Sequence, residues 1–191
     1  MAARHKPIAP DELTAAQRTL YDSIVSGPRG EGKQSFPLTD KAGALNGPFG
    51  IMLHAPALGQ ALQELGSAIR YRSTVSARVR EVAILLVAVA ERSDFEWWAH
   101  KNIGRDVGLS EEELDAISSA RFESGNPVEQ ASSEFVAALI RGGELSDTEF
   151  DWFVVAIGRP QVLELTILVG YYSTLALSMR IFDVGVPALD G

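Results

Sequence analysis

Residues 79–110, VREVAILLVAVAERSDFEWWAHKNIGRDVGLS, contain the pattern that decides how this chain folds. Residues 79–90 are apolar on almost every helical face, which is typical of a helix buried in the middle of a protein. Ser93 is followed three residues later by Glu96, which matches a capping box and predicts the start of a second helix. Gly108 is placed to end that helix. The stretch therefore predicts a buried central helix followed by a second, capped helix.

A second capping box follows at Ser110 and Glu113. Leu109 and Leu114 are placed to form a hydrophobic staple, which fixes the angle of a short helix over residues 114–117. This short helix and the one before it therefore predict a tight helical hairpin near the middle of the chain.

Helical periodicity also dominates the rest of the sequence. We expect further helices over residues 11–25, 49–54, 56–72, 127–141, 146–157 and 160–182. The Gly/Pro-rich loop 27–36 is the segment that we expect to be most flexible. A strand over residues 79–90 is the weaker alternative, and no repeat or linker divides the chain. The sequence therefore predicts one all-α domain over residues 1–191.

The composition limits the classes of function. The chain has 191 residues, of which 46% are hydrophobic and 22% charged, which suits a single domain with a substantial core. Its formal charge of -8 opposes attraction to phosphates, so we expect no nucleic-acid partner. No apolar run reaches the roughly 18 residues of a membrane span, and the N-terminal residues lack the apolar core of a signal peptide. We therefore expect a cytoplasmic protein without a membrane partner.

The chain contains no cysteine. This removes disulfides, thiolate nucleophiles and sulfur ligands for metals, so redox chemistry would need a bound cofactor. A metal site is a weak alternative, because Glu81, Glu96 and His100 could supply two oxygens and a nitrogen, whereas such sites usually draw on more histidines. We expect neither a cofactor nor a metal.

A carboxylate and an imidazole lie one helical turn apart at Glu96 and His100. Residues four apart on a helix face the same way, so these side chains can share one cavity. Glu81 is a second carboxylate on the preceding apolar helix, and Ile84 and Ala88 on its face predict that it points inward. Two carboxylates and an imidazole in an apolar setting can move protons without a cofactor. We therefore expect the three side chains to meet in one cavity.

Each of these three residues also has a structural interpretation. Glu96 could close the capping box at the start of its helix, and His100 could be a core histidine that donates to a carbonyl. Glu81 could be a first-turn acid paired with Arg78 or Arg80. The spacing alone leaves these alternatives open.

Further side chains are candidates for a substrate site. Ser93 is more typical of a helix cap than of a catalytic hydroxyl. Trp97 and the pair Tyr171 and Tyr172 more often fill a core or a subunit interface, although one tyrosine hydroxyl could reach the cavity. His54 is a further candidate, since it lies close to the helix predicted to begin at residue 56.

Three groups of motifs also resemble a known family. They are REVAIL (80–85), FEWWAH (95–100) and GLS (108–110); NGPF (46–49) and HAP (54–56); and LEL (163–165) and GYY (170–172). Together they resemble the carboxymuconolactone decarboxylase family, which shares its all-α fold with alkylhydroperoxidase-D-like proteins. The resemblance spans roughly residues 45–185, preceded by an N-terminal helix and loop over residues 1–44. It implies a helical bundle of that type and a homo-oligomer, a trimer or a hexamer.

The peroxidase branch of this superfamily has a glutamate, then two cysteines, then a histidine. This chain has Glu81 and His100 at the positions of the glutamate and the histidine, and Ser93 and Glu96 at the positions of the cysteines. A disulfide-cycling peroxidase needs two sulfurs, so we expect no thiol peroxidase activity. The decarboxylase branch also has glutamate at the second cysteine position and keeps the histidine, as this chain does.

The residues and the resemblance together predict a cofactor-independent decarboxylase, or a related lyase or isomerase, acting on a small carboxylated lactone or keto acid. His100 would donate the proton, Glu96 would orient it or act as general base, and Glu81 would complete the relay. The substrate carboxylate needs a positive partner, for which Arg78, Arg80 or an arginine of a neighbouring subunit are candidates. The alternative is a non-catalytic ligand-binding or assembly protein, which an acidic pocket without a nearby arginine would favour.

Overall fold

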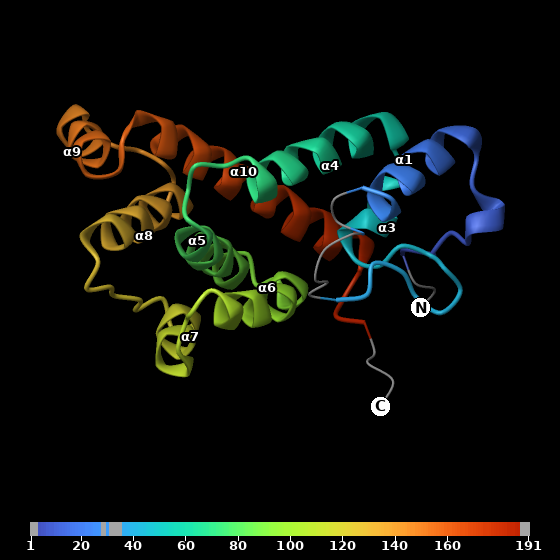
Figure 1. Cartoon of the computed structure of the whole chain (residues 1–191), viewed down its shortest axis with the longest axis horizontal. Coiled ribbons are helices and arrows are strands. Elements are labelled where there is room, and N and C mark those ends of the chain that lie inside the picture. The colour runs from blue at the N-terminus through green and yellow to red at the C-terminus, as the bar shows by residue number, and fades with distance from the viewer. Residues whose placement is uncertain (1–3, 28–29, 31–35, 188–191) are drawn as a thin grey trace.

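The computed structural model describes residues 4–27, 30 and 36–187, and the regular structure within them is helical (Figure 1), apart from one isolated bridge between Thr39 and Leu45. The elements are a short 3-10 helix at Pro10–Glu12 and the helices α1 (Ala15–Val25), α3 (Pro48–Met52), α4 (Pro56–Tyr71), α5 (Ala77–Ala90), α6 (Asp94–Asp106), α7 (Glu111–Ser118), α8 (Pro127–Ile140), α9 (Asp147–Ile157) and α10 (Arg159–Phe182). The all-α prediction is confirmed. Most of the loop 27–36, which we expected to be flexible, lies outside the described residues.

Helix α5 is the central element of the fold. It packs against α6, α7, α8 and α10, and Figure 1 shows it enclosed by these helices. One hydrophobic cluster on α5 includes Ile84 and joins it to Phe135 of α8 and Leu165 of α10, whereas Leu85 belongs to a second cluster with Leu114 of α7. A helix with neighbours on several sides needs apolar residues on several faces, which confirms the prediction of a buried central helix.

Helices α6 and α7 form the predicted hairpin. Ser110 and Glu113 make a reciprocal capping box, in which each backbone N–H donates to the other residue's side chain, at 2.8 and 3.2 Å. Leu109 and Leu114 are both buried in the second cluster, as the staple requires. Gly108 has φ +92°, a left-handed conformation that glycine adopts without a steric penalty.

The largest boundary error is at the N-terminal end. The periodicity predicts a helix from residue 11, whereas α1 begins at Ala15. Thr14 caps this helix: its N–H donates to Gln17 Oε1 at 2.9 Å, and the Gln17 N–H donates to Thr14 Oγ1 at 3.4 Å. A capping box fixes the residue before the helix in an extended conformation, so the helix cannot continue backwards through it. The other predicted boundaries agree to within about three residues, the largest difference being at α7, which begins at Glu111 and not at residue 114.

Helix α10 also corrects the expectation that no segment has the character of a membrane span. By length and composition alone, Arg159–Phe182 could cross a membrane, and half of its most apolar stretch is buried inside the molecule. Core helices of proteins without a membrane partner share this property. The expected absence of a membrane partner stays a prediction.

Candidate active site

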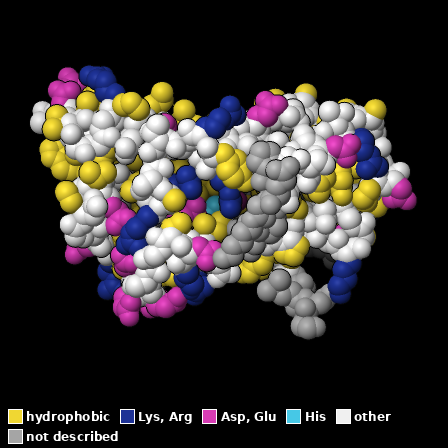
Figure 2. All heavy atoms as spheres, viewed as in Figure 1, with side chains coloured by type: hydrophobic (Ala, Val, Ile, Leu, Met, Phe, Trp, Pro, Cys, Tyr) yellow, Lys and Arg dark blue, Asp and Glu magenta, His cyan; other side chains and the backbone are white. Residues whose placement is uncertain are grey.

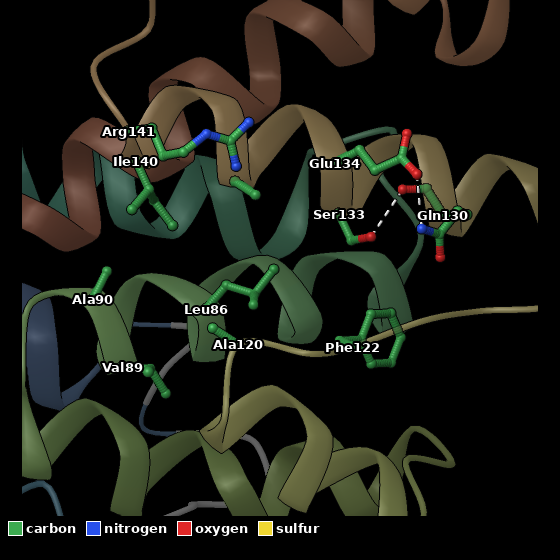
Figure 3. Close-up of a pocket in the computed structure, with 11 residues that line it drawn as sticks. Leu86, Val89, Ala90, Ala120, Phe122, Gln130, Ser133, Glu134, Ile140 and Arg141 are labelled. Atoms are coloured by element: carbon green, nitrogen blue, oxygen red, sulfur yellow. Dashed lines mark hydrogen bonds between the residues drawn. The ribbon is translucent and has the colours of Figure 1, made fainter.

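The structure brings Glu81, Glu96 and His100 together where α5 and α6 pack. Nδ1 of His100 lies 2.7 Å from Glu81 Oε2, and Nε2 of the same ring lies 3.5 Å from Glu96 Oε2. The three residues are 7% (His100), 3% (Glu81) and 3% (Glu96) exposed. The imidazole therefore lies between two buried carboxylates. The pocket between α5 and α8 in Figure 3 is lined by other residues, among them Leu86 and Ser133. A cavity shared by the three side chains stays a prediction.

The start of α6 explains why the Glu96 side chain is available to His100. Ser93 Oγ accepts from the Glu96 N–H at 3.3 Å, as in a helix cap. The reciprocal half of the predicted capping box is wrong, because the Ser93 N–H donates instead to the carbonyl of Ala88 at 2.8 Å. With that donor already used, the Glu96 carboxylate turns into the protein toward His100. Ser93 itself acts as a cap.

The contact with Glu81 limits the tautomer of His100. An ionised carboxylate can only accept, so beside an ionised Glu81 the ring carries its proton on Nδ1 and donates from it. Nε2 then faces Glu96. Its 3.5 Å separation from Glu96 is longer than an ordinary N–H···O hydrogen bond. Among the described residues, no group of three or more His, Asp or Glu side chains is arranged to hold a metal ion.

Arg80 supplies positive charge beside the two carboxylates. Its Nε lies 3.7 Å from Glu81 Oε1, and its side chain is 15% exposed. This Nε atom is buried and, within the part of the chain that the structure describes, makes no hydrogen bond. Figure 2 shows histidine atoms in a hollow near the middle of the viewed face, with Lys or Arg and Asp or Glu side chains gathered around them. Arg80 is thus an arginine close to the cluster with a donor still available.

Arg78 has a different environment, which removes it from the substrate-binding candidates. Its Nε donates to Glu129 Oε1 at 2.8 Å, and its other nitrogens donate to the Gly108 carbonyl and to Glu113. Burial favours the neutral form, but the hydrogen bonds and charges of Glu113 and Glu129 outweigh it and raise the pKa of Arg78. Because each of its three nitrogens already donates a hydrogen bond, Arg78 braces α5 against α7 and α8.

A tyrosine of α10 covers the imidazole. The ring of Tyr172 lies edge-on to that of His100, with centroids 5.2 Å apart and planes at 90°. Tyr171, the other tyrosine of the candidate pair, is buried and lies edge-on to Tyr172 instead. The two residues are adjacent, so only the rotation of α10 relative to α6, which one sequence does not reveal, decides which of them contacts His100.

The remaining candidates lie in other surroundings. His54 contacts His5 at 3.2 Å and stacks on Phe182 at the C-terminal end of α10, so the structure does not bring it to the carboxylates. Burial and the charge of His54 lower the pKa of His5. Trp97 packs against the hydrophobic cluster that contains Val82, as expected of a core aromatic residue. The proposed substrate contacts of His54 and Trp97 therefore find no support in their positions.

Residues 56–138 match the sequence profile of the carboxymuconolactone decarboxylase family. This segment belongs to that family. It runs from the start of α4 through most of α8 and contains Glu81, Glu96 and His100. Among curated proteins, no sequence relative of the chain is found.

Solved structures with the same fold include an AhpD-like protein of unknown function from Agrobacterium tumefaciens. It is 19% identical, with a TM-score of 0.63, over 72% of this chain and 96% of the other. The debrominase Bmp8 in its apo form is 13% identical with a TM-score of 0.68, over 95% and 91% of the two chains. A Bmp8 variant bound to 2,3,4-tribromopyrrole is 14% identical with a TM-score of 0.67, over 96% and 93%. These likenesses confirm the alkylhydroperoxidase-D-like fold.

Proposed function

We propose that this protein is a cofactor-independent acid–base enzyme, a decarboxylase or a related lyase or isomerase that acts on a small carboxylated lactone or keto acid. The observation that carries the proposal is the buried imidazole of His100 between Glu81 and Glu96, at 2.7 and 3.5 Å. A histidine held by one carboxylate and close to a second can transfer protons repeatedly. The carboxymuconolactone decarboxylase match of the segment that contains these residues supports the same chemistry.

Arg80 would bind the substrate carboxylate. Its guanidinium is partly buried, and a planar guanidinium pairs with a carboxylate through two parallel hydrogen bonds. In this pairing the substrate carboxylate would lie on the side of the Arg80 guanidinium that does not face Glu81. The nearby arginine that we expected of a decarboxylase is therefore present, which favours this proposal over a purely ligand-binding protein.

The reaction needs two proton-dependent events. When the bond between the substrate carbon and its carboxylate breaks, carbon dioxide leaves and the electron pair remains on the substrate as an enolate. Nε2–H of His100 would then protonate that carbon, and Glu96 would return a solvent proton to Nε2. Glu81 would hold the ring through Nδ1 and stabilise the imidazolium form. The net change consumes one proton and releases one carbon dioxide.

Two further observations support a small cyclic substrate and acid–base chemistry. The chain has no cysteine, so it lacks the sulfurs of a disulfide-cycling peroxidase. A variant of Bmp8, which has the same fold, binds 2,3,4-tribromopyrrole, a small ring. A ring of similar size is a reasonable ligand for this scaffold.

The test is a direct screen for turnover. The purified chain is incubated with carboxymuconolactone and related carboxylated lactones and keto acids, and loss of ultraviolet absorbance is measured together with released carbon dioxide. We expect equal molar amounts of substrate lost and carbon dioxide released. His54→Gln is the matched control, since His54 lies outside the cluster, and it should keep full activity. Tight binding of these acids without turnover would support the ligand-binding alternative instead.

A further inference from the structure

Helix α10 has an exposed stripe that the described part of the chain does not cover. Its residues follow alternating steps of four and three: Leu163, Ile167, Gly170, Thr174, Leu177 and Ile181. The four large side chains of this stripe are 61%, 37%, 49% and 57% exposed in chain order, and none of the six residues is charged. A repeat of 3.5 residues is the pattern through which two helices pack along their length.

The exposed apolar surface of the molecule is concentrated around this helix. Among the described residues, eleven large apolar side chains are exposed, and nine of them lie on three helices: Leu58, Leu65 and Tyr71 of α4, Trp152 and Val155 of α9, and Leu163, Ile167, Leu177 and Ile181 of α10. Helices α4 and α9 both contact α10, and Figure 1 shows the three along one side of the molecule. Together the nine expose as much as about five complete side chains, or roughly 500 Å² at about 100 Å² each.

This area suits a protein partner. A stable interface buries about 800 Å² per partner, of which somewhat more than half is apolar. The exposed apolar side chains of α4, α9 and α10 together are therefore comparable in area to the apolar part of such an interface. Apolar patches of a few hundred Å² often mark interaction sites.

Gly170 adds an independent observation. It lies in the middle of a 24-residue helix, where glycine costs roughly 1 kcal/mol relative to alanine. No atom of the described chain lies within 4 Å of the place where its Cβ would be, so packing within the chain does not require a glycine. Close approach of a second backbone from outside would require one.

We propose that two copies of this chain pair through α10, antiparallel, about a two-fold axis that passes between Gly170 and Thr174. In this register Leu163 meets Ile181, Ile167 meets Leu177, and Gly170 meets Thr174 of the other copy. Large side chains oppose large ones and small oppose small, so the stripe is complementary to itself, as a two-fold interface requires. The family resemblance implies a trimer or a hexamer. Pairing through α10 fits a hexamer made of three dimers and not a trimer, and the stripe specifies the face, the symmetry and the register.

A lipid bilayer is the other occupant that α10 could have by its length and composition. A helix in a bilayer needs neither a stripe whose order of large and small side chains is the same from both ends nor a glycine in the middle of that stripe. Both features are present, and both favour a second copy. The formal charge of -8 on each chain also makes an uncharged contact surface the favourable place for two copies to meet.

Sedimentation velocity of the full chain tests the pairing. We expect the wild type to have an even multiple of the 20.6-kDa chain mass and Gly170→Leu to have half the wild-type mass. Since nothing in the described chain contacts that position, the variant should keep its circular dichroism and still unfold cooperatively. Val128→Gln, at an exposed apolar residue of α8, is the matched control and should keep the wild-type mass.

A charge exchange tests the register. Leu163→Glu and Ile181→Lys should each dissociate the dimer, because each puts a charge against an apolar side chain, and the double variant should restore it through two new ion pairs. A wild-type monomer at every concentration, an odd number of chains, or a Gly170→Leu variant with the wild-type mass would each overturn the proposal. Wild-type binding to phosphatidylcholine vesicles that Gly170→Leu retains would overturn it in favour of the bilayer.

Discussion

Nδ1 of His100 lies 2.7 Å from Glu81 Oε2, and this hydrogen bond joins α6 to α5 across 19 positions of sequence. Both side chains are buried, so the bond replaces water for two polar groups at once. It also fixes the orientation of the ring, so that Nε2 of His100 points toward Glu96. The relationship makes Glu81 a positioning residue, whose loss should change the chemistry of His100 without any contact to substrate.

Glu81→Gln should therefore lower kcat on the order of a hundredfold and change KM little, because the amide no longer stabilises the imidazolium form. Steady-state kinetics on a substrate found in the screen measures both constants, and a pH–rate profile should show an altered pKa for the essential base. A variant with unchanged kcat and an unchanged pH profile would contradict the relay.

Arg80→Gln should act on binding. If Arg80 pairs with the substrate carboxylate, its loss should raise KM on the order of tenfold to a hundredfold, corresponding to one or two charge-assisted hydrogen bonds. The variant should lose the preference for a carboxylated substrate over its methyl ester, which is the measurement that separates binding from a general loss of activity. Unchanged discrimination between acid and ester would show that Arg80 does not bind the carboxylate.

Arg78→Gln should act on stability instead. Arg78 pairs with Glu129, which is buried, and removing the guanidinium leaves that carboxylate without its countercharge. Breaking one side of a buried ion pair costs about 3–5 kcal/mol. Denaturant unfolding should show this loss of free energy, with Arg105→Gln, whose ion pair with Glu111 is exposed, as the comparison that loses little stability. Equal stability of the two variants would mean that Arg78 does not brace the hairpin.

Glu164 predicts how stability depends on pH. Burial opposes its ionisation, but hydrogen bonds from Ser73 Oγ at 2.6 Å and from the Thr74 N–H at 2.8 Å outweigh it and lower the pKa of Glu164. A lowered pKa adds stability at pH values above the ordinary 4.5, and this stability is lost as the pH falls through the pKa of the folded state. Glu164→Gln should therefore be less stable than wild type at pH 7, by about 1–2 kcal/mol.

The same comparison at acidic pH provides the control. Once the pH has fallen below the folded-state pKa of Glu164, the two proteins should unfold at nearly the same temperature. A difference in thermal midpoint that stays constant from pH 7 to pH 3 would show that the carboxylate charge is not the source of the effect. Because Glu164 anchors the loop before α5, the experiment also reports on the element that carries Glu81.

The sequence predicts the parts of this fold that depend on local chemistry. Capping boxes and apolar periodicity locate most helix boundaries, as at Ser110 and α7. Helical spacing likewise places Glu96 and His100 on one face. The two errors at helix caps arise because a capping group has more than one possible partner. The Thr14 N–H donates to Gln17, so α1 begins after Thr14. The Glu96 carboxylate does not accept from the Ser93 N–H, so the capping box predicted there is incomplete.

Which side chains of neighbouring helices reach the candidate site depends on how the helices pack, and a single sequence does not reveal that packing. Arg78 and Arg80 are two residues apart on α5 and look equivalent as carboxylate partners. Packing directs Arg78 toward Glu129 of α8 and leaves Arg80 beside Glu81. The choice of Tyr172 over Tyr171 has the same origin, since it follows from the rotation of α10 against α6.

The central claim is that His100 delivers the proton that replaces carbon dioxide. The most direct measurement is turnover in deuterium oxide, with the product examined by mass spectrometry and proton magnetic resonance for His100→Asn and for wild type. We predict one deuterium per product molecule, at the carbon that lost the carboxylate and on one face only, and a rate for His100→Asn lower by on the order of a hundredfold to ten-thousandfold with the helical content unchanged. Wild-type rates from His100→Asn, or a product labelled equally on both faces by the wild type, would contradict the account.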